Sequence, residues 1–310
     1  MDTFYLIIGL IVLVLGGEFL IRGAIPLAVR MKVSMVVVGL TVVSFATSAP
    51  ELIVSIYSAL TGHSDIALGN VIGSNIANIT LVLGVTALIF PLGFQKRLYR
   101  FDLPVMLFAS ALFGVFLYLD TGLNFFEGFC FVLILCFLTI YLIRYSQNND
   151  NVSFDKNTQH NSLVKMLLYI VFGGGCLYLG SNWLVDGAAG IARSFGVSER
   201  IISVSIISFG TSVPEFAASI IAALKKEKDL SIGNLIGSNI FNVFAVLGIT
   251  SMIQPIQVID KGLINNDLWW MFGAVLLLYP LMFFFHKRHV GRIEGSILFI
   301  FYMTYIYLLF

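Results

Sequence analysis

The chain has 310 residues, of which 58% are hydrophobic and only 11% are charged, and its mean hydropathy is +0.95. Soluble domains typically carry about 25% charged residues, so this composition excludes an ordinary soluble domain. The formal net charge of +1 gives no support for a nucleic-acid partner, because the basic residues lie in loops and at the ends of the predicted spans. We therefore expect a multi-pass protein of the cell membrane (inner or plasma membrane), surrounded by the lipid bilayer and with no obligate protein partner evident.

Ten stretches reach the length of about 20 apolar residues that a membrane-spanning helix needs. The second, third, seventh and eighth are interrupted by Gly, Pro, Ser, Thr and Asn, whereas the others are plain apolar helices expected to form a scaffold. The ten predicted spans cover residues 4–24, 35–60, 67–91, 102–119, 125–145, 164–190, 201–224, 230–255, 268–285 and 293–310.

A polar stretch at residues 146–162 is predicted to link a first repeat, residues 1–145, to a second repeat, residues 163–310. The two halves match at a constant offset of 164 positions, which relates Glu51 to Glu215 and the segment 69–78 to the segment 233–242. Leu-rich helices resemble one another by composition, but a shared Thr-Ser-x-Pro-Glu and a shared Gly-Asn-x-Ile-Gly-Ser-Asn-Ile-x-Asn do not arise in that way. Because each half has five spans, the second half enters the membrane from the opposite side, and this predicts an inverted-topology repeat.

The distribution of charge supports the same topology. If the N-terminus lies outside, 15 of the 18 basic residues fall in cytoplasmic loops, and the exceptions are Arg193, Arg200 and Lys261. This asymmetry follows the positive-inside rule. The expected fold class is an all-α integral membrane protein with ten transmembrane helices in two inverted five-helix repeats, with both termini outside and the linker in the cytoplasm.

Each repeat carries one acidic residue inside an interrupted span, Glu51 in the first and Glu215 in the second. At the centre of a membrane helix such a group costs about 2.5–3.5 kcal/mol or more, so it marks a functional site. Pro50 lacks an N–H and crowds the preceding turn, which frees or tilts the carbonyls near residues 44–46. Thr47 and Ser48 precede Glu51 by four and three residues, and we expect all three on one helical face.

The second repeat builds the same cluster from Thr211, Ser212 and Glu215. The third and eighth spans add further oxygen atoms in two pairs that are four residues apart, which are Ser74 with Asn78 and Ser238 with Asn242. Carboxylate, hydroxyl and carbonyl oxygens are the ligands that calcium and sodium prefer. Glycines in these two spans are expected to allow close helix approach or local unwinding. The remaining asparagines are expected to serve helix packing, and they are Asn70, Asn75, Asn234 and Asn239.

The charge of this cluster suits a divalent ion. Two glutamates carry −2, which one Ca²⁺ neutralises and several Na⁺ offset, and without these ions the carboxylates are expected to take up protons. A site that binds alternative ions in competition has the minimum equipment for an exchanger, and no cofactor is expected. Three other acids, Asp186, Glu127 and Glu294, lie near span ends and are expected to be solvated.

These motifs resemble the sodium/calcium exchanger family of the cation/calcium antiporter superfamily, over essentially the whole chain, and the short linker resembles its compact prokaryotic members. The resemblance implies that Glu51 and Glu215 are the central calcium ligands, and that the first and sixth helices slide to alternate access. The other implied contributors are Thr47 and Thr211, the backbone carbonyls of Ser44 and Ser208, the sodium-site residues Ser48, Ser212, Ser74 and Ser238, and Asn78 and Asn242 at the middle of the site. Some relatives carry aspartate at position 242, so this chain has two carboxylates there instead of three.

The expected function is secondary antiport of Na⁺ against Ca²⁺ by alternating access. The alternatives are an H⁺/Ca²⁺ antiporter, or another cation/Ca²⁺ antiporter such as a K⁺-dependent one, with the same architecture. A cation channel is less favoured, because channels usually align filter segments around a symmetric oligomeric pore and here the two-fold symmetry lies within one chain. An enzyme is not expected, since no nucleophile–base pair or metalloprotease motif occurs.

Overall fold

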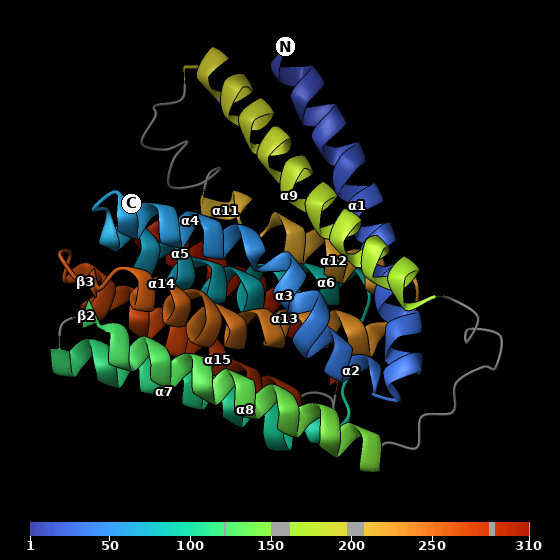
Figure 1. The fold of residues 1–310 in the computed structure, drawn as a ribbon. Coiled ribbons are helices and arrows are strands. Elements are labelled where there is room, and N and C mark those ends of the chain that lie inside the picture. The colour runs from blue at the N-terminus through green and yellow to red at the C-terminus, as the bar shows by residue number, and fades with distance from the viewer. Residues whose placement is uncertain (121, 150–161, 197–207, 285–288, 310) are drawn as a thin grey trace. The chain divides into compact units, whose positions relative to one another are not determined.

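The computed structural model describes residues 1–120, 122–149, 162–196, 208–284 and 289–309 (Figure 1). They form two compact units, of which unit 1 comprises Met1–Thr47 and Ile143–Asn234, and unit 2 comprises Ser48–Leu142 and Leu235–Phe310. The boundaries at Thr47 and Asn234 fall inside the second and eighth predicted spans. Each unit therefore contains parts of both sequence repeats, whose division at residues 146–162 stays a prediction.

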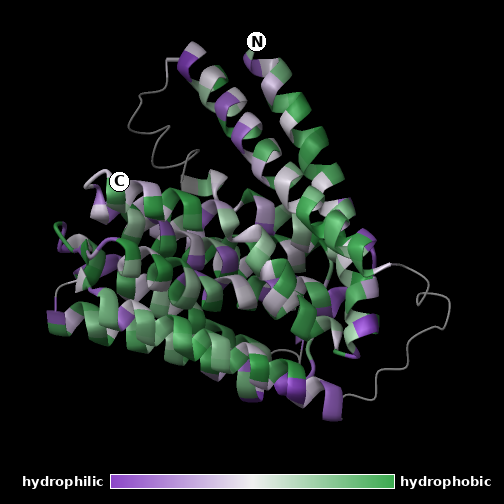
Figure 2. Ribbon diagram, viewed as in Figure 1, coloured by the Kyte–Doolittle hydropathy of each residue, from purple (hydrophilic) through white to green (hydrophobic). Residues whose placement is uncertain are grey.

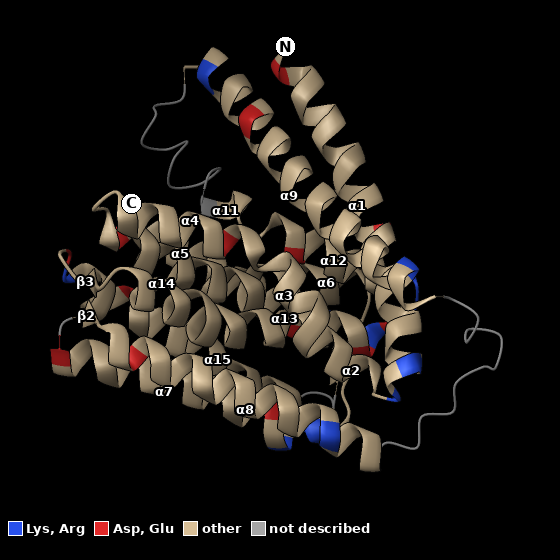
Figure 3. Ribbon diagram, viewed as in Figure 1, with Lys and Arg blue, Asp and Glu red and all other residues tan. Residues whose placement is uncertain are grey.

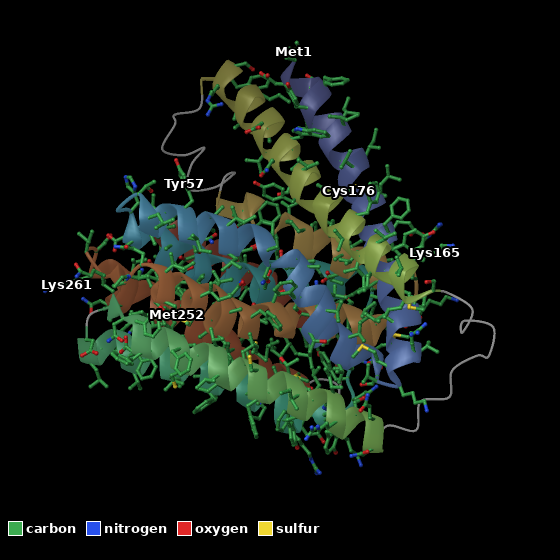
Figure 4. All side chains as sticks on the ribbon, viewed as in Figure 1. Met1, Tyr57, Lys165, Cys176, Met252 and Lys261 are labelled. Carbon is green, nitrogen blue, oxygen red and sulfur yellow. The ribbon has the colours of Figure 1, made fainter. Side chains whose placement is uncertain are left out.

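Unit 1 is built on two long antiparallel helices, α1 (Asp2–Met31) and α9 (Leu163–Ser194), which lie side by side in Figure 1. Figure 4 marks Met1 at one end of this pair and Lys165 at the other. The remaining elements of unit 1 are α2 (Met35–Val38), the π-helix η1 (Gly39–Val43), α3 (Ser44–Thr47), α11 (Ser208–Gly210), α12 (Val213–Leu224) and the first half of α13 (Lys228–Phe241).

Glycines spaced seven residues apart form the contact between α1 and α9. A Cβ atom added at Gly16 would lie 2.7 Å from the backbone nitrogen of Leu177, and one at Gly173 would lie 2.5 Å from that of Leu20. The two backbones therefore touch, as small residues allow in membrane helices. The six glycines are Gly9, Gly16 and Gly23 in α1 and Gly173, Gly180 and Gly187 in α9, two sets that differ by the same 164 positions as the glutamates.

Unit 2 contains the remaining helices and four two-residue strands. Its first part comprises α4 (Ala49–Leu60), α5 (Ser64–Ala77), η2 (Asn78–Val82), α6 (Leu83–Ile89), β1 (Leu92–Gly93), η3 (Leu98–Asp102), α7 (Leu103–Asp120), β2 (Gly122–Leu123) and most of α8 (Phe125–Asn149). Its second part comprises the end of α13, η6 (Asn242–Leu247), α14 (Gly248–Ile253), β3 (Ile256–Gln257), η7 (Leu263–Asp267), α15 (Leu268–Phe284), β4 (His289–Val290) and α16 (Arg292–Leu309).

Local structure in unit 2 repeats at nearly the same spacing as the sequence. The antiparallel pair β1–β4 aligns Leu92 with Val290, and the pair β2–β3 aligns Leu123 with Ile256. Position 92 corresponds to 256 at the offset of 164, and 123 corresponds to 290 at an offset of 167, so the two strand pairs are equivalent under the repeat. The π-helices η2 and η6 likewise begin at equivalent positions, 78 and 242.

Long apolar helices confirm a multi-pass membrane protein, and Figure 2 shows α1, α7 and α8 coloured mainly as hydrophobic. Within the described ranges, seven helices are long and apolar enough to cross a membrane, and the bent pair Met35–Thr47 and Ala49–Leu60 makes eight. Of the ninth predicted span, α15 has 17 residues, and residues 201–207 of the seventh lie outside the described residues. Ten spans therefore stay a prediction.

Two acids near helix starts are buried rather than solvated, which corrects the expectation for Glu127 and Glu294. The Glu127 Oε2 atom accepts a hydrogen bond from the backbone N–H of Asn124 at 2.7 Å, and Glu294 Oε2 accepts one from Gly291 at 2.9 Å. A carboxylate in the first turn satisfies a backbone N–H that has no partner within the helix. Burial of these two side chains is therefore compatible with their polarity.

We predict opposite effects for alanine at two neighbouring glycines of α9. Gly173→Ala places a methyl group against the backbone of α1 and should destabilise the protein by about 1–3 kcal/mol, the usual cost of overpacking. Gly175→Ala is the matched control, because no described atom lies within 4 Å of its added Cβ, and it should stabilise the helix by about 0.5–1 kcal/mol. Thermal unfolding midpoints in detergent measure both changes, and equal shifts for the two variants would contradict the close contact.

Candidate ion-binding site

A break in the chain precedes Glu51. Helix α3 ends at Thr47, α4 begins at Ala49, and the two segments differ in direction by 45°. Pro50 thus lies in the first turn of α4, where a missing N–H costs no helical hydrogen bond, and the carbonyl of Ser48 accepts a hydrogen bond from Leu52 N at 3.2 Å. This corrects the expectation that Thr47, Ser48 and Glu51 lie on one face of a single helix, because Thr47 ends α3 whereas Ser48 caps the helix α4 that contains Glu51.

The second motif has the same local structure. Helix α11 ends at Gly210 and α12 begins at Val213, so Pro214 and Glu215 also lie in the first turn of a helix. The carbonyl of Ser212 accepts a hydrogen bond from Phe216 N at 3.1 Å. Ser208 begins α11, and its side chain lies outside the described part of the chain.

The predicted site residues fall into two groups, one in each unit. In unit 1, α3 contacts α12, and Glu215, Thr47, Ser44 and Ser212 are buried while Thr211 is half-buried. In unit 2, α4 contacts α5, η6 and α14, and every predicted contributor there is buried. These residues are Ser48, Glu51, Ser74, Asn78, Ser238 and Asn242. Both glutamates have an exposed fraction of 0%, so one of these two acids is removed from solvent in each unit.

Two asparagines hold the backbone at the glutamates, and sequence reasoning assigned both to packing. Asn70 Nδ2 donates to the backbone oxygen of Glu51 at 3.2 Å and to Ser55 Oγ at 3.1 Å. The equivalent contacts recur 164 positions later, within unit 1. There Asn234 Nδ2 donates to the backbone oxygen of Glu215 at 3.4 Å and to Ser219 Oγ at 3.0 Å. The recurrence of whole triplets at one offset, 51, 55 and 70 with 215, 219 and 234, is the signal that could have identified this role.

Close backbone contact brings Asn234 to the first motif within unit 1. A Cβ added at Gly39 would lie 2.6 Å from the oxygen of Leu230, and one at Gly233 would lie 2.5 Å from that of Val36. This confirms the close approach predicted for Gly233. No described atom meets an added Cβ at Gly73 within 4 Å, so close helix approach, one of the two roles expected of these glycines, does not occur at that position.

Asn242 joins the two sequence repeats inside unit 2. Its Nδ2 atom donates to Ser74 Oγ at 3.1 Å and to Asn75 Oδ1 at 3.0 Å. Asn75 and Asn239 form a reciprocal pair. Asn75 Nδ2 donates to the backbone oxygen of Asn239 at 3.3 Å, and Asn239 Nδ2 donates to the backbone oxygen of Asn75 at 3.0 Å. These bonds fit the packing role predicted for Asn75 and Asn239.

The carboxamide of Asn78 has an exposed fraction of 0%, and neither its nitrogen nor its oxygen has a hydrogen-bond partner in the described part of the chain. A buried polar group without a partner costs about 1–3 kcal/mol, and an ion or an ordered water is the usual reason that a native protein keeps one. Asn78 also begins the π-helix η2, and π-helical turns are frequent at functional sites. The carboxamide is therefore suited to contact an ion, directly or through water.

Charged residues are few along most of the helices of either unit, as Figure 3 shows. The described contributors are carboxylate, hydroxyl and carboxamide groups, whose oxygen atoms suit hard cations such as Ca²⁺ and Na⁺. In the described residues no cluster of three or more His, Cys, Asp or Glu occurs. The donor set therefore differs from that of a transition-metal centre, which draws on imidazole and thiolate.

Known proteins match nearly the whole length of this chain. The family described as sodium/calcium exchanger protein matches residues 1–144 and 165–310. The chain belongs to the sodium/calcium exchanger family. It is 36% identical to the putative antiporter CaxA of Alkalimonas amylolytica, over 99% of this chain and 98% of that protein. The sodium/calcium exchanger MaX1 of Methanosarcina acetivorans is 28% identical, over 98% of this chain and 97% of its own length.

Solved structures extend the likeness to the fold. The sodium-calcium exchanger NCX_Mj, in crystals soaked without Na⁺ and Ca²⁺, matches with a TM-score of 0.84 and 28% identity, over 99% of this chain and 98% of its own. The same exchanger soaked with 10 mM Na⁺ and no Ca²⁺ matches with a TM-score of 0.83. This family member is therefore a multi-pass transporter of the cell membrane with the exchanger fold.

Two isosteric substitutions test the contrast between Asn78 and Asn75. Asn78→Leu removes polar atoms without partners and should raise the thermal unfolding midpoint in chelator, because about 1–3 kcal/mol of desolvation cost disappears. It should also reduce the stabilisation that added calcium produces. Asn75→Leu should lower the midpoint, because it removes the bonds to Asn239 and Asn242. Equal decreases of the midpoint in both variants would contradict the contrast in hydrogen bonding between Asn78 and Asn75.

Proposed function

We propose that this protein exchanges Na⁺ for Ca²⁺ across the cell membrane by secondary antiport. The observation that carries the proposal is the pair of fully buried acids, Glu51 and Glu215, each in the first turn of a helix after a break. An apolar scaffold would be more stable without them, whereas a site for a divalent cation needs their charge. Family membership and the likeness to exchangers over nearly the full chain support the same function.

The proposed ligand set keeps the residues that the sequence indicated. Glu51 and Glu215 are the central ligands of Ca²⁺, and two carboxylates balance the charge of one such ion. Because positions 78 and 242 both hold asparagine, Glu51 and Glu215 carry the negative charge of the proposed site. The oxygens proposed to complete the calcium and sodium sites belong to Thr47, Thr211, Ser48, Ser212, Ser74, Ser238, Asn78 and Asn242, and to the backbone at Ser44 and Ser208.

The proposed topology is ten transmembrane helices in two inverted five-helix repeats, with both termini outside. Several features support it, and they are the constant offset of the motifs, the equivalent strand pairs of unit 2, the matched glycines of α1 and α9, and the basic residues in predicted cytoplasmic loops. Odd numbers of spans per repeat make the two halves antiparallel in the membrane. One ion site drawn from both halves can then face either side in turn.

Substitution of either central acid should stop exchange. Glu51→Gln and Glu215→Gln keep the shape of the side chain and remove the charge. Removing one partner from a buried charged site typically costs about 3–5 kcal/mol, so calcium uptake should fall at least about a hundredfold. Glu18→Gln is the control, since Glu18 pairs with Arg22 at 2.6 Å and Lys225 at 2.7 Å on a partly exposed surface and should keep near-normal uptake. Normal transport by either central variant would refute the site.

The counter-ion is tested with purified protein in liposomes. An outward sodium gradient should drive uptake of radiolabelled calcium, and a pH gradient imposed without sodium should not. Each condition is repeated with and without potassium, because a potassium-dependent exchanger needs both cations. Uptake driven by the pH gradient alone would replace the proposal with proton/calcium antiport, and flux that needs no counter-ion would indicate a channel.

A further inference from the structure

Asn234 has hydrogen-bond partners in both sequence motifs, all within unit 1. Its Oδ1 atom accepts from Thr47 Oγ1 at 3.2 Å, and its backbone oxygen lies 2.9 Å from Ser44 Oγ, which shares its one proton with the Gly39 oxygen at 2.7 Å. Its Nδ2 atom donates to the backbone oxygen of Glu215 and to Ser219 Oγ. The exposed fraction of Asn234 is 1%, so water does not compete for these bonds.

The contact with Thr47 offers a second acceptor to the proton of its hydroxyl group. A threonine hydroxyl carries one proton and two lone pairs, and the Thr47 oxygen lies 3.2 Å from Asn234 Oδ1 and 3.3 Å from the backbone oxygen of Ser44. When the proton points to Asn234, the carbonyl of Ser44 does not have to accept it. A cation bound at Thr47 would then meet the oxygen of the hydroxyl group rather than its proton.

The contact with Glu215 acts on the other motif. Glu215 lies in the first turn of α12, which begins at Val213, and its carbonyl oxygen has two lone pairs, so it can accept a side-chain donor besides its partner within the helix. The Asn234 amide supplies a donor to this carbonyl. A hydrogen bond that holds the Glu215 carbonyl in place also fixes the Cα atom from which the Glu215 side chain extends.

We propose that Asn234 is a positioning residue of the ion site, which orients the Thr47 hydroxyl and the Glu215 backbone together through one carboxamide. This inference rests on the proposed function, because it assigns a role toward ions bound by those two residues. It assigns Asn234 no direct contact with an ion. The carboxamide uses both its oxygen and its nitrogen, so an apolar residue of similar shape cannot replace it.

The same helix offers a matched control. Ser231 Oγ donates to the backbone oxygen of Ser219 at 2.9 Å and is fully buried. Ser231→Ala therefore removes a hydrogen bond between the same helices, α13 and α12, one turn away. It leaves the contacts to Thr47 and Glu215 in place. A purely structural role for Asn234 predicts that both substitutions act alike on ion affinity.

The test measures sodium-driven calcium uptake in liposomes for Asn234→Ala, the isosteric Asn234→Leu and Ser231→Ala. We expect both Asn234 variants to raise the calcium concentration for half-maximal uptake by roughly tenfold, the effect of losing about one well-placed buried hydrogen bond, with a smaller change in maximal rate. Ser231→Ala should stay within about twofold of the wild type on the same reasoning. Asn234→Leu keeps a branched side chain and avoids a cavity if Asn234→Ala does not fold.

A double-mutant cycle with Thr47→Val gives the second readout. In that background no hydroxyl proton remains to be oriented, so Asn234→Leu should raise the half-maximal concentration by a smaller factor than in the wild type. Equal shifts for Asn234→Leu and Ser231→Ala, or factors that simply multiply in the double variant, would overturn the positioning role. Absence of calcium exchange by the wild type would instead overturn the proposed function, so the two failures are distinguishable.

Discussion

Hydrocarbon contains no water to satisfy a backbone group that has lost its helical partner, and this constraint governs the organisation of both motifs. Pro50 and Pro214 are tolerated because each lies in the first turn of a new helix. The carbonyls of Glu51 and Glu215 then receive side-chain donors from Asn70 and Asn234, which lie on the helix that follows. Within each unit, the helix that carries the glutamate and the following helix that carries the asparagine are therefore joined by a hydrogen bond at the carbonyl of the glutamate.

The two repeats match in residue type at positions 78 and 242 but differ in their hydrogen bonds. Positions 78 and 242 both hold asparagine and both begin a π-helix. The amide of Asn242 reaches Ser74 and Asn75, whereas the amide of Asn78 has no hydrogen-bond partner among the described residues. The same side chain therefore has different surroundings in the two repeats. The carboxamide of Asn78 is better suited than that of Asn242 to contact an ion.

Composition and motif spacing predicted the membrane class and the family, since these depend on apolar length and on which residues recur at one offset. The exact break before Pro50 could not be predicted, because a proline fits the interior of a kinked helix as well as the first turn of a new one. The burial of Glu127 and Glu294 depends on backbone N–H groups that periodicity does not reveal. The role of Asn234 was missed for a similar reason, as its partner Thr47 is distant in the sequence. The count of ten spans and the complete ligand set stay predictions.

The bond between Thr47 and Asn234 also couples the two matching halves of the sequence. A residue of the first half contacts a residue of the second, and that second residue also contacts a glutamate of its own half. A substitution at position 47 therefore changes the surroundings of Asn234 and, through its carboxamide, those of Glu215. The two halves are partners in contact as well as similar in sequence.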